Sequence, residues 1–339
     1  MKQTPQGSSL IAGAWRRLAI AAFALIAHDA MAQETTPALP QSLDDAWWTG
    51  PIVAAGAGTM PQGHMLVEPY VYDAIRTKRF DGNGDRQSAP RSDGFGSLTY
   101  ILYGVTDRFT AGLIPTFGYT DARDGTDSSG IQAGDLTLQG QYRLTQFREG
   151  SHVPTMSVVL QQSLPTGKYE RLGSRPNDGF GTGAYTTTLA LYSQYYFWMP
   201  NGRILRTRLN VSHAFSNDVD IEDVSVYGTG EDFSGEARPG DVFTLNSSWE
   251  YSMTRNWVFA FDFLFQHDAS TFVSGTYSSE GTPERIDARS GSAWRFGIAP
   301  ALEYNFNSRI GVIAGARWFV AGKNTNATIT PVMAVNMVF

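Results

Sequence analysis

Apolar and polar side chains alternate with a period of two along most of this chain. In residues 257–266 the odd positions from Trp257 to Phe265 are all aromatic, whereas the even positions are small, aliphatic or polar, with Asp262 among them. Residues 294–306 repeat this arrangement, with large side chains opposed to Gly, Ala and charged residues. Successive side chains of a strand point to opposite faces, so strict alternation indicates strands rather than helices. The pattern predicts an all-β protein.

The alternation predicts twelve strands of about 10–14 residues, close to the 9–11 or so that a tilted membrane-crossing strand needs. Strands of soluble sandwiches are shorter, usually about 5 or 6 residues. Strand boundaries read from a sequence are uncertain by about 2–4 residues, so ten or fourteen strands stay open. We expect strands at residues 64–74, 95–105, 108–120, 134–145, 153–164, 184–197, 203–215, 241–253, 256–268, 292–306, 309–320 and 327–339.

Short and long connections alternate between the expected strands. Outer-membrane barrels have short turns at the periplasmic end and longer loops outside. The sequence therefore predicts a transmembrane, antiparallel, up-and-down β-barrel with both chain ends in the periplasm. The acidic segment 216–238 is expected to be a mobile external loop, with divalent-cation binding as the alternative. Tight turns are expected at residues 105–108, 253–256 and 306–309, and long polar loops near residues 79–94, 121–134, 165–183, 216–239 and 269–291.

The two ends of the chain carry export and assembly features. A basic start, an apolar run at residues 18–27 and Ala30-Met31-Ala32 form the pattern of a cleaved signal peptide, which predicts export across a bacterial inner membrane. Export leaves a periplasmic, a secreted or an outer-membrane protein open, and the barrel pattern favours the outer membrane of a Gram-negative bacterium. The last expected strand closes on Phe339, which resembles the signal that the outer-membrane assembly machinery reads. We expect a signal peptide at residues 1–32, a periplasmic or plug segment at residues 33–62, and the barrel at residues 63–339.

Composition excludes several classes of protein. Charged residues make up only 17 % of the chain, against about 25 % in soluble domains, while aromatic residues reach 13 %. A formal net charge of −6 offers no basic footprint for nucleic acid, so no nucleic-acid partner is expected. The chain has no cysteine, which excludes disulfides, cysteine–zinc sites and thiol nucleophiles. No stretch after the signal peptide is long and apolar enough for a membrane-spanning helix.

The phase of the alternation puts five acids and five arginines on the inner face of the barrel. Charges that face lipid near the midplane cost about 2–4 kcal/mol each, so their common phase supports the barrel. They could pair and fill the interior, or they could line a polar path and contact a solute; twelve strands leave only a narrow lumen. These lumen-lining or solute-contacting candidates are Glu68, Asp135, Arg143, Arg206, Arg208, Glu250, Asp262, Arg295, Glu303 and Arg317. The small inner residues Gly297, Ala299 and Ala301 favour an open lumen.

The segment before the first strand contains Trp47 and Trp48, followed by a run of Ala and Gly. Tryptophan prefers the membrane–water interface, so the segment could rest there as a periplasmic extension. Alternatively, Trp47 and Trp48 belong to a plug, because two adjacent tryptophans are costly to leave in water and the Ala/Gly run could pass through a narrow bore.

Signatures of an enzyme are weak. No histidine of the exported chain lies in a known metal-ligand spacing, and no G-x-S-x-G nucleophile sequence occurs. Ser212 and His213 are adjacent in one expected strand, so their side chains point to opposite faces and cannot form a nucleophile–base pair. No G-x-G-x-x-G or phosphate-binding loop occurs. We expect no enzyme, no catalytic residue, no metal and no cofactor.

Several short motifs mark turns and strand starts over most of the exported chain. They are Trp47-Trp48-Thr49-Gly50-Pro51, Pro61-Gln62-Gly63-His64 leading into Glu68-Pro69-Tyr70, Tyr103-Gly104-Val105-Thr106-Asp107-Arg108-Phe109, Gly134-Asp135-Leu136-Thr137, Tyr142-Arg143-Leu144 and Ser163-Leu164-Pro165-Thr166-Gly167-Lys168-Tyr169. Together they resemble a known family of outer-membrane proteins, named "transporter" or meta-pathway phenol-degradation porins. The resemblance implies a β-barrel and a role in uptake of small hydrophobic or aromatic compounds.

We therefore expect an outer-membrane channel for passive uptake of a small solute, aromatic or hydrophobic. The expected partners are outer-membrane lipid and lipopolysaccharide, the assembly machinery and the solute. A sealed structural or surface-interaction barrel without transport is the first alternative, and a membrane-embedded hydrolase the second.

Overall fold

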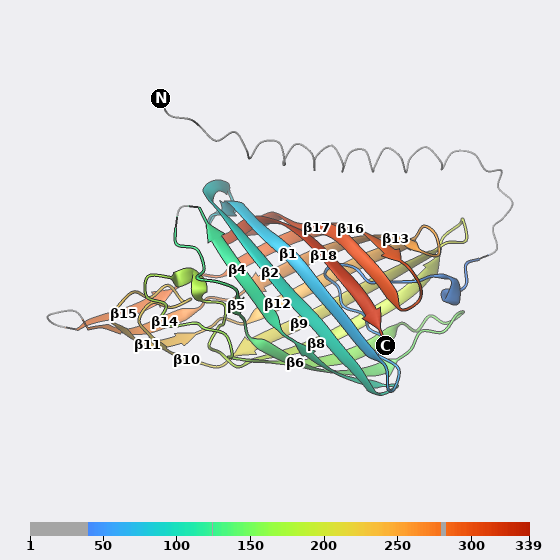
Figure 1. The fold of residues 1–339 in the computed structure, drawn as a ribbon, viewed down its shortest axis with the longest axis horizontal. Coiled ribbons are helices and arrows are strands. Elements are labelled where there is room, and N and C mark those ends of the chain that lie inside the picture. Colours follow the sequence, from blue (N-terminus) through green and yellow to red (C-terminus); the bar gives the residue numbers. More distant parts are fainter. Residues whose placement is uncertain (1–39, 124, 279–282) are drawn as a thin grey trace, which may run out of the picture. The chain divides into compact units, whose positions relative to one another are not determined.

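One antiparallel sheet closes on itself to form the body of the protein (Figure 1). The computed structural model describes residues 40–123, 125–278 and 283–339, so the expected signal peptide lies outside the described residues. Strand β1 (Met65–Phe80) pairs with β2 (Arg86–Thr106) on one side and with β18 (Thr325–Val338) on the other, which closes the ring. The twelve strand positions of this antiparallel barrel confirm the predicted fold class.

Two of the twelve positions are interrupted strands. Pro115, which has no N–H for the sheet, separates β3 from β4, yet its carbonyl accepts a hydrogen bond from Thr99 N–H at 3.1 Å. Gly134 and Asp135 separate β5 from β6 in the same way. After β2 the barrel strands are β3 (Phe109–Ile114) with β4 (Thr116–Ala122), β5 (Gln132–Ala133) with β6 (Leu136–Thr145), β7 (Thr155–Leu164), β8 (Thr186–Trp198), β9 (Ile204–Ser216), β12 (Val242–Ser252), β13 (Trp257–Asp268), β16 (Ala293–Asn305), β17 (Ile310–Lys323) and β18.

The predicted faces are the observed faces. In β13 the even positions from Val258 to Leu264 are buried, whereas Trp257, Phe259 and Phe263 are exposed on the outer surface. Large exposed side chains occur on other barrel strands too, for example Trp249 and Met333. A ring of outward apolar side chains is the surface that a bilayer solvates. Among the described residues, no helix is long and apolar enough to cross a membrane.

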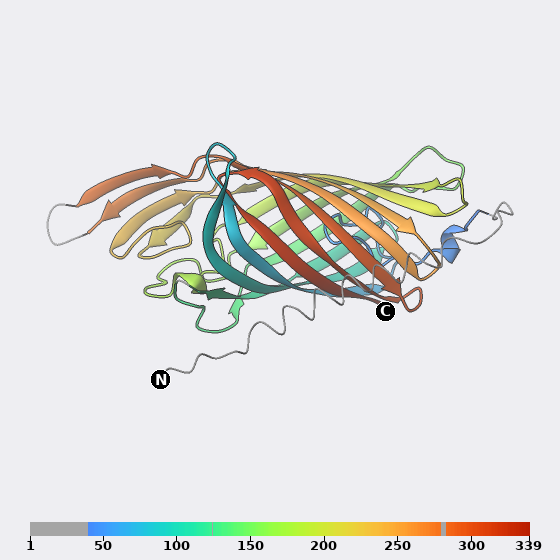
Figure 2. The same cartoon turned by 90° about the horizontal axis from the view of Figure 1, so that it is seen from above.

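Apart from the β1–β2 hairpin and the turn at Asn324 between β17 and β18, the longer connections gather at one end of the barrel and the short turns at the other. We call these ends the loop end and the short-turn end (Figures 1 and 2). The expected tight turns at 105–108, 253–256 and 306–309 all lie at the short-turn end. The expected long loop at 79–94 is wrong, because β1 and β2 continue their pairing from Arg76 to Phe80 and leave only a hairpin at residues 81–85. Its polar residues belong to strand ends rather than to a loop.

The loop end carries a second, four-stranded sheet that the alternation did not predict. Its strands are β10 (Val219–Glu222), β11 (Phe233–Arg238), β14 (Phe272–Tyr277) and β15 (Glu284–Arg289), in that order. Ile221, Phe233, Ala237 and Val273 form its buried cluster. The expectation of a mobile loop at 216–238 is therefore wrong: that segment contains two of the four strands.

Candidate functional site in the barrel lumen

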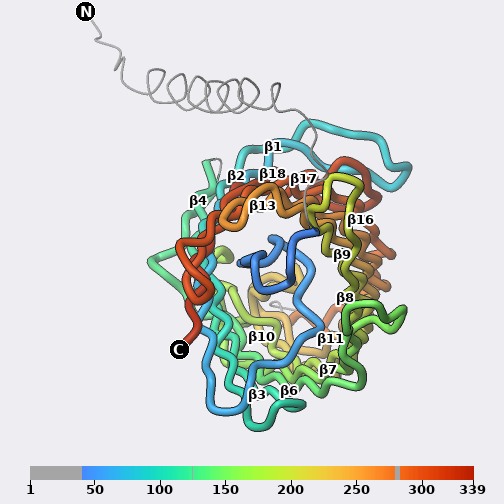
Figure 3. The backbone as a smooth tube through the Cα atoms, turned by 90° about the vertical axis from the view of Figure 1, so that its right-hand side faces the viewer, coloured from blue at the N-terminus to red at the C-terminus, as the bar shows by residue number. Residues whose placement is uncertain are grey.

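Residues 46–60 pass through the ring of strands, where Figure 3 shows them as part of the blue tube; together with the flanking residues 41–45 and 61–62 we call them the inner segment. The segment begins at the short-turn end with a short 3₁₀ turn, η1 (Leu43–Asp45). Gln41 N–H donates to the carbonyl of Gly202 at 2.8 Å, and Trp47 N–H donates to the carbonyl of Arg255 at 3.2 Å. The segment then runs along the inner wall and leaves toward β1.

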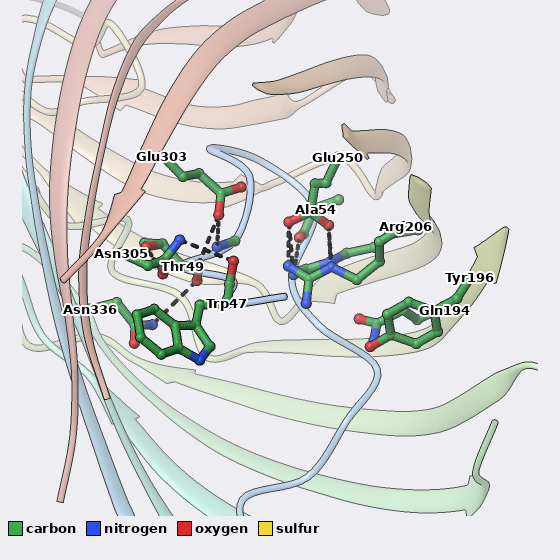
Figure 4. Close-up of polar contacts among 12 residues, drawn as sticks. Trp47, Thr49, Ala54, Gln194, Tyr196, Arg206, Glu250, Glu303, Asn305 and Asn336 are labelled. Carbon is green, nitrogen blue, oxygen red and sulfur yellow. Dashed lines mark hydrogen bonds and ion pairs between the residues drawn. The ribbon is translucent and has the colours of Figure 1, made fainter. Parts of the chain in front are cut away.

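Two carboxylates of the wall accept backbone N–H groups of the inner segment. Glu303 Oε2 accepts from Thr49 at 2.8 Å and from Gly50 at 3.1 Å (Figure 4). Asp262 accepts from Ile52 at 3.1 Å and, through its other oxygen, from Ala54 at 3.2 Å. Each of these side chains therefore satisfies two backbone N–H groups, so both anchor the segment.

Wall side chains also donate to the carbonyls of the inner segment. Arg208 Nη1 donates to the carbonyl of Ala54 at 2.8 Å, and Asn210 Nδ2 donates to the next carbonyl at 2.9 Å. Gln141 Nε2 donates to the carbonyls of residues 56 and 58, at 3.1 Å each. The backbone of the segment is thus bonded from both sides of the lumen, which satisfies groups that burial would otherwise leave unpaired.

A buried ion cluster lies beside the inner segment on β9 and β12. Arg206 Nε donates to Glu250 Oε2 at 2.7 Å, and Arg208 Nε lies 3.0 Å from the same oxygen. The Glu250 side chain is completely buried and both arginines are nearly so. The Arg206 guanidinium also lies 4.2 Å from the ring centroid of Trp48, so the cluster contacts the segment through a cation–π interaction.

Small residues of β17 make room for the inner segment. A side chain on Gly311 would collide with the hydroxyl of Thr49, and one on Gly315 would reach 2.7 Å from the terminal methyl of Ile52. The expectation that small inner residues leave the lumen open is therefore wrong in this part of the barrel. The space beside Ala301 is filled by Ile52, which packs against the cluster that contains Ala301. The space beside Gly297 is filled by Phe319, whose ring would lie 3.0 Å from a Cβ at position 297.

A cavity of about 290 Å³ remains between the inner segment and the wall. Tyr70 and Tyr100 form an edge-to-face pair in its lining, with ring centroids 6.0 Å apart. Leu66 and Leu102 add apolar surface, and the carboxyl of Glu68 adds a polar group that accepts a hydrogen bond from Asn336. The cavity therefore combines aromatic and aliphatic walls with a few fixed polar groups, as small-molecule sites do.

The structure brings together six of the ten charged candidates around the inner segment and its cavity: Glu68, Arg206, Arg208, Glu250, Asp262 and Glu303. Arg295 and Arg317 lie nearer the loop end, and both guanidinium groups contact the ring of Phe319. Asp135 instead bonds loop residues, accepting from Gly167 N–H and from Thr182 N–H. Arg143 is partly exposed and opposite Ser157 near the short-turn end.

The other candidates lie at the short-turn end. Trp47 stacks against the guanidinium of Arg255, with 4.5 Å from the guanidinium carbon to the ring centroid. Phe339 follows β18, exchanges backbone hydrogen bonds with Met65 and exposes 62 % of its surface. The role of Phe339 in assembly stays a prediction.

Sequence reasoning missed the neutral residues that bind the inner segment. Gln141, Asn210 and Ser157 all donate to its carbonyls, and Thr110 accepts from Met60 N–H at 2.9 Å. All four are buried on the inner face of the barrel. An uncharged polar residue at an inward position of a strand was therefore the sequence signal that could have identified them.

Ser212 and His213 do not form a nucleophile–base pair in the structure. His213 lies exposed at the loop end, where its Nε2 is 3.1 Å from an Asp241 oxygen. Ser212 is on the opposite face of β9, as expected. The described residues contain no cluster of three or more His, Asp or Glu side chains that could hold a metal ion.

Two loops at the loop end are joined through Asp178, which ends the short helix η2 (Pro176–Asp178). Its oxygens accept from Ser129 N–H at 2.6 Å and from the Ser129 hydroxyl at 2.9 Å. The backbone N–H of Ser129 lowers the pKa of Asp178 below the ordinary 3.8. The carboxylate form is therefore the form that holds the two loops together.

We expect this loop contact to weaken in acid. A lowered folded-state pKa adds stability that is present above the ordinary pKa and is lost as the pH falls below it, through the pKa of folded Asp178. Hydrogen exchange of the peptide around Ser129, corrected for the intrinsic pH dependence, should lose protection below about pH 4. D178N should show the lower protection at neutral pH already; protection in D178N equal to wild type would contradict the role of the carboxylate.

Comparison with known proteins gives one family and one fold. The model of a family described as "Putative MetA-pathway of phenol degradation" matches residues 78–330. The COG4313 outer membrane channel from Pseudomonas putida F1 is similar at 14 % identity and a TM-score of 0.64, over 85 % of this chain and 100 % of that chain. The beta domain of the Bordetella autotransporter Brka follows at 12 % identity and a TM-score of 0.43, over 82 % and 100 %. No curated protein matches the chain.

Proposed function

Since the chain belongs to this phenol-degradation family, we propose that it forms an outer-membrane channel for passive uptake of a small aromatic or hydrophobic solute. A closed barrel with an outward apolar surface is suited to a bilayer. Export through a cleaved signal peptide, and contact with lipid and lipopolysaccharide, belong to the same proposal.

The observation that carries the proposal is the internal cavity of about 290 Å³. An apolar cavity of about 150 Å³ already holds benzene, so this one has room for a single-ring compound. Tyr70 and Tyr100 supply ring contacts, while Glu68 and the amides of Gln139 and Gln141 can orient a hydroxyl or carboxyl group. The lining suits a ring with one polar substituent better than a sugar, which would need polar partners on all sides.

A sealed barrel is the second candidate, favoured by the hydrogen bonds that hold the inner segment across the lumen. A channel and a sealed barrel differ in the ionic current that they pass across a planar bilayer. A channel gives discrete conductance steps in a planar bilayer, and small aromatic compounds that enter the cavity reduce them. A sealed barrel stays silent at every voltage, which would contradict the proposal.

We expect Q139W to reduce the conductance steps and their block by phenol, because the indole would fill the cavity beside Gln139. L138W is the matched control: Leu138 is the neighbour on β6 and is exposed on the outer face, where tryptophan is tolerated. Equal conductance and equal block in both variants would show that the solute path does not pass this cavity.

A further inference from the structure

Three arginines share one patch of the inner wall on the loop-end side of the anchored part of the inner segment. They are Arg76 on β1, Arg295 on β16 and Arg317 on β17; we call them the arginine group. Arg76 pairs with Thr328, and Arg317 pairs with Thr330 two positions along β18. Arg295 and Arg317 lie against Phe319, with 5.1 and 5.3 Å from each guanidinium carbon to the ring centroid. The three side chains are partly exposed, so water reaches them inside the barrel.

No carboxylate of the described residues forms an ion pair with the arginine group. Among the ion pairs of the described residues, none includes Arg76, Arg295 or Arg317. Each of the three has a buried Nε without a hydrogen-bond partner. Asp268 attracts Arg295 electrostatically but forms no ion pair with it. Asp268 Oδ1 instead accepts a hydrogen bond from Gln266 Nε2 at 2.6 Å. The guanidinium groups are therefore available to another anion.

The arginine group differs from the buried arginines of the ion cluster in having no carboxylate partner among the described residues. Arg206 and Arg208 are compensated by Glu250, and Arg208 also donates to a carbonyl of the inner segment. Burying a charge without a partner is costly, and the arginine group differs from Arg206 and Arg208 in staying partly exposed to water, so an incoming anion can reach it. A planar guanidinium binds a carboxylate through two parallel hydrogen bonds, which is the strongest pairing available to it.

We infer that the arginine group binds the carboxylate of a small organic anion that enters the barrel from the loop end. This inference rests on the proposed function and narrows its solute to a compound that carries a carboxylate. The anion meets Arg295 and Arg317 before it reaches the part of the inner segment held by Glu303, because Arg295 and Arg317 are nearer the loop end of β16 and β17 than Glu303 and its strand partner Ile313. The group would hold the carboxylate on the loop-end side of the cavity, whose lining includes none of the three arginines.

The test compares benzoate with benzyl alcohol, which has the same ring but no charge. In planar bilayers, benzoate should block the conductance steps of the full exported chain at a concentration roughly tenfold or more below that of benzyl alcohol. R295Q and R317Q should each remove most of this difference. R143Q, the same charge change on the inner face near the other end of the barrel, should keep it. Inorganic phosphate serves as a second anion.

The outcomes separate the inference from the proposed function. Equal block by benzoate and benzyl alcohol, unchanged benzoate block in R295Q and R317Q, or phosphate acting as strongly as benzoate would overturn the inference while the channel stands. Without any current the proposed function fails. Calorimetric titration of benzoate into the detergent-solubilised protein then decides: binding that R317Q abolishes supports the carboxylate site, and no binding overturns it.

Discussion

E250A is expected to lower the free energy of unfolding by about 3–5 kcal/mol, because it leaves two buried guanidinium groups without their counter-charge. Glu250 is completely buried and is the carboxylate that both Arg206 and Arg208 contact. The Arg206 and Arg208 side chains are only 8 % and 7 % exposed, so little bulk solvent reaches them in its place. Urea titration of the refolded barrel, followed by tryptophan fluorescence, measures the change.

The exposed pair between Arg171 and Glu222 supplies the matched control. E222A removes the same group from an ion pair whose side chains are more than half exposed, and such pairs contribute only about 0–1 kcal/mol. E250Q should lie between the two variants, since an amide keeps part of the hydrogen bonding. A loss in E250A no larger than the loss in E222A would mean that the buried cluster is not needed for stability.

Removing residues 42–60 is expected to raise the single-channel conductance several-fold. These residues occupy the lumen and are bonded to wall side chains on both sides, so their removal empties the part of the lumen that they fill. The strands keep their pairing, because β1 begins at Met65. Conductance steps in a planar bilayer provide the measurement, and heat-dependent migration in electrophoresis shows that the shortened barrel has folded.

A point variant tests the same idea without shortening the chain. D262A combined with E303A removes the acceptors of four backbone N–H groups of the inner segment and should raise the conductance or add larger substates. D268A changes another inner aspartate of β13 that does not bond the segment, and should leave the conductance steps near wild type. Unchanged conductance in both the deletion and the double variant would show that the inner segment does not limit the current.

The strands could be predicted because their signal is local. Alternation along β13 and β16 survives in the sequence, since each outward side chain faces lipid and each inward one faces a crowded lumen. The second sheet was missed because β10 and β11 have only four and six residues, too few for alternation to stand out from a polar loop.

The position of the inner segment could be suggested only from its two tryptophans. The segment is held mainly through its own N–H and C=O groups, and every residue has these, so no side-chain pattern records the contacts. The alternation along β13 and β16 also predicted that Asp262 and Glu303 lie on the inner face of the barrel. Their partners lie more than 200 residues away, in a segment without periodicity.

The β1–β2 hairpin has a consequence for the outer surface of the cell. β2 has 21 residues, and at about 3.3 Å per residue and a tilt of about 40° it rises roughly 50 Å, twice the apolar band of about 25 Å. Its upper part and the facing end of β1 are mostly exposed and polar, including Lys78, Arg79 and Arg86. Because outer-membrane barrels carry their longer loops on the outside of the cell, we expect the hairpin to project beyond the lipid on one side of the barrel mouth. An antibody or protease outside the cell would then contact the hairpin before the bilayer.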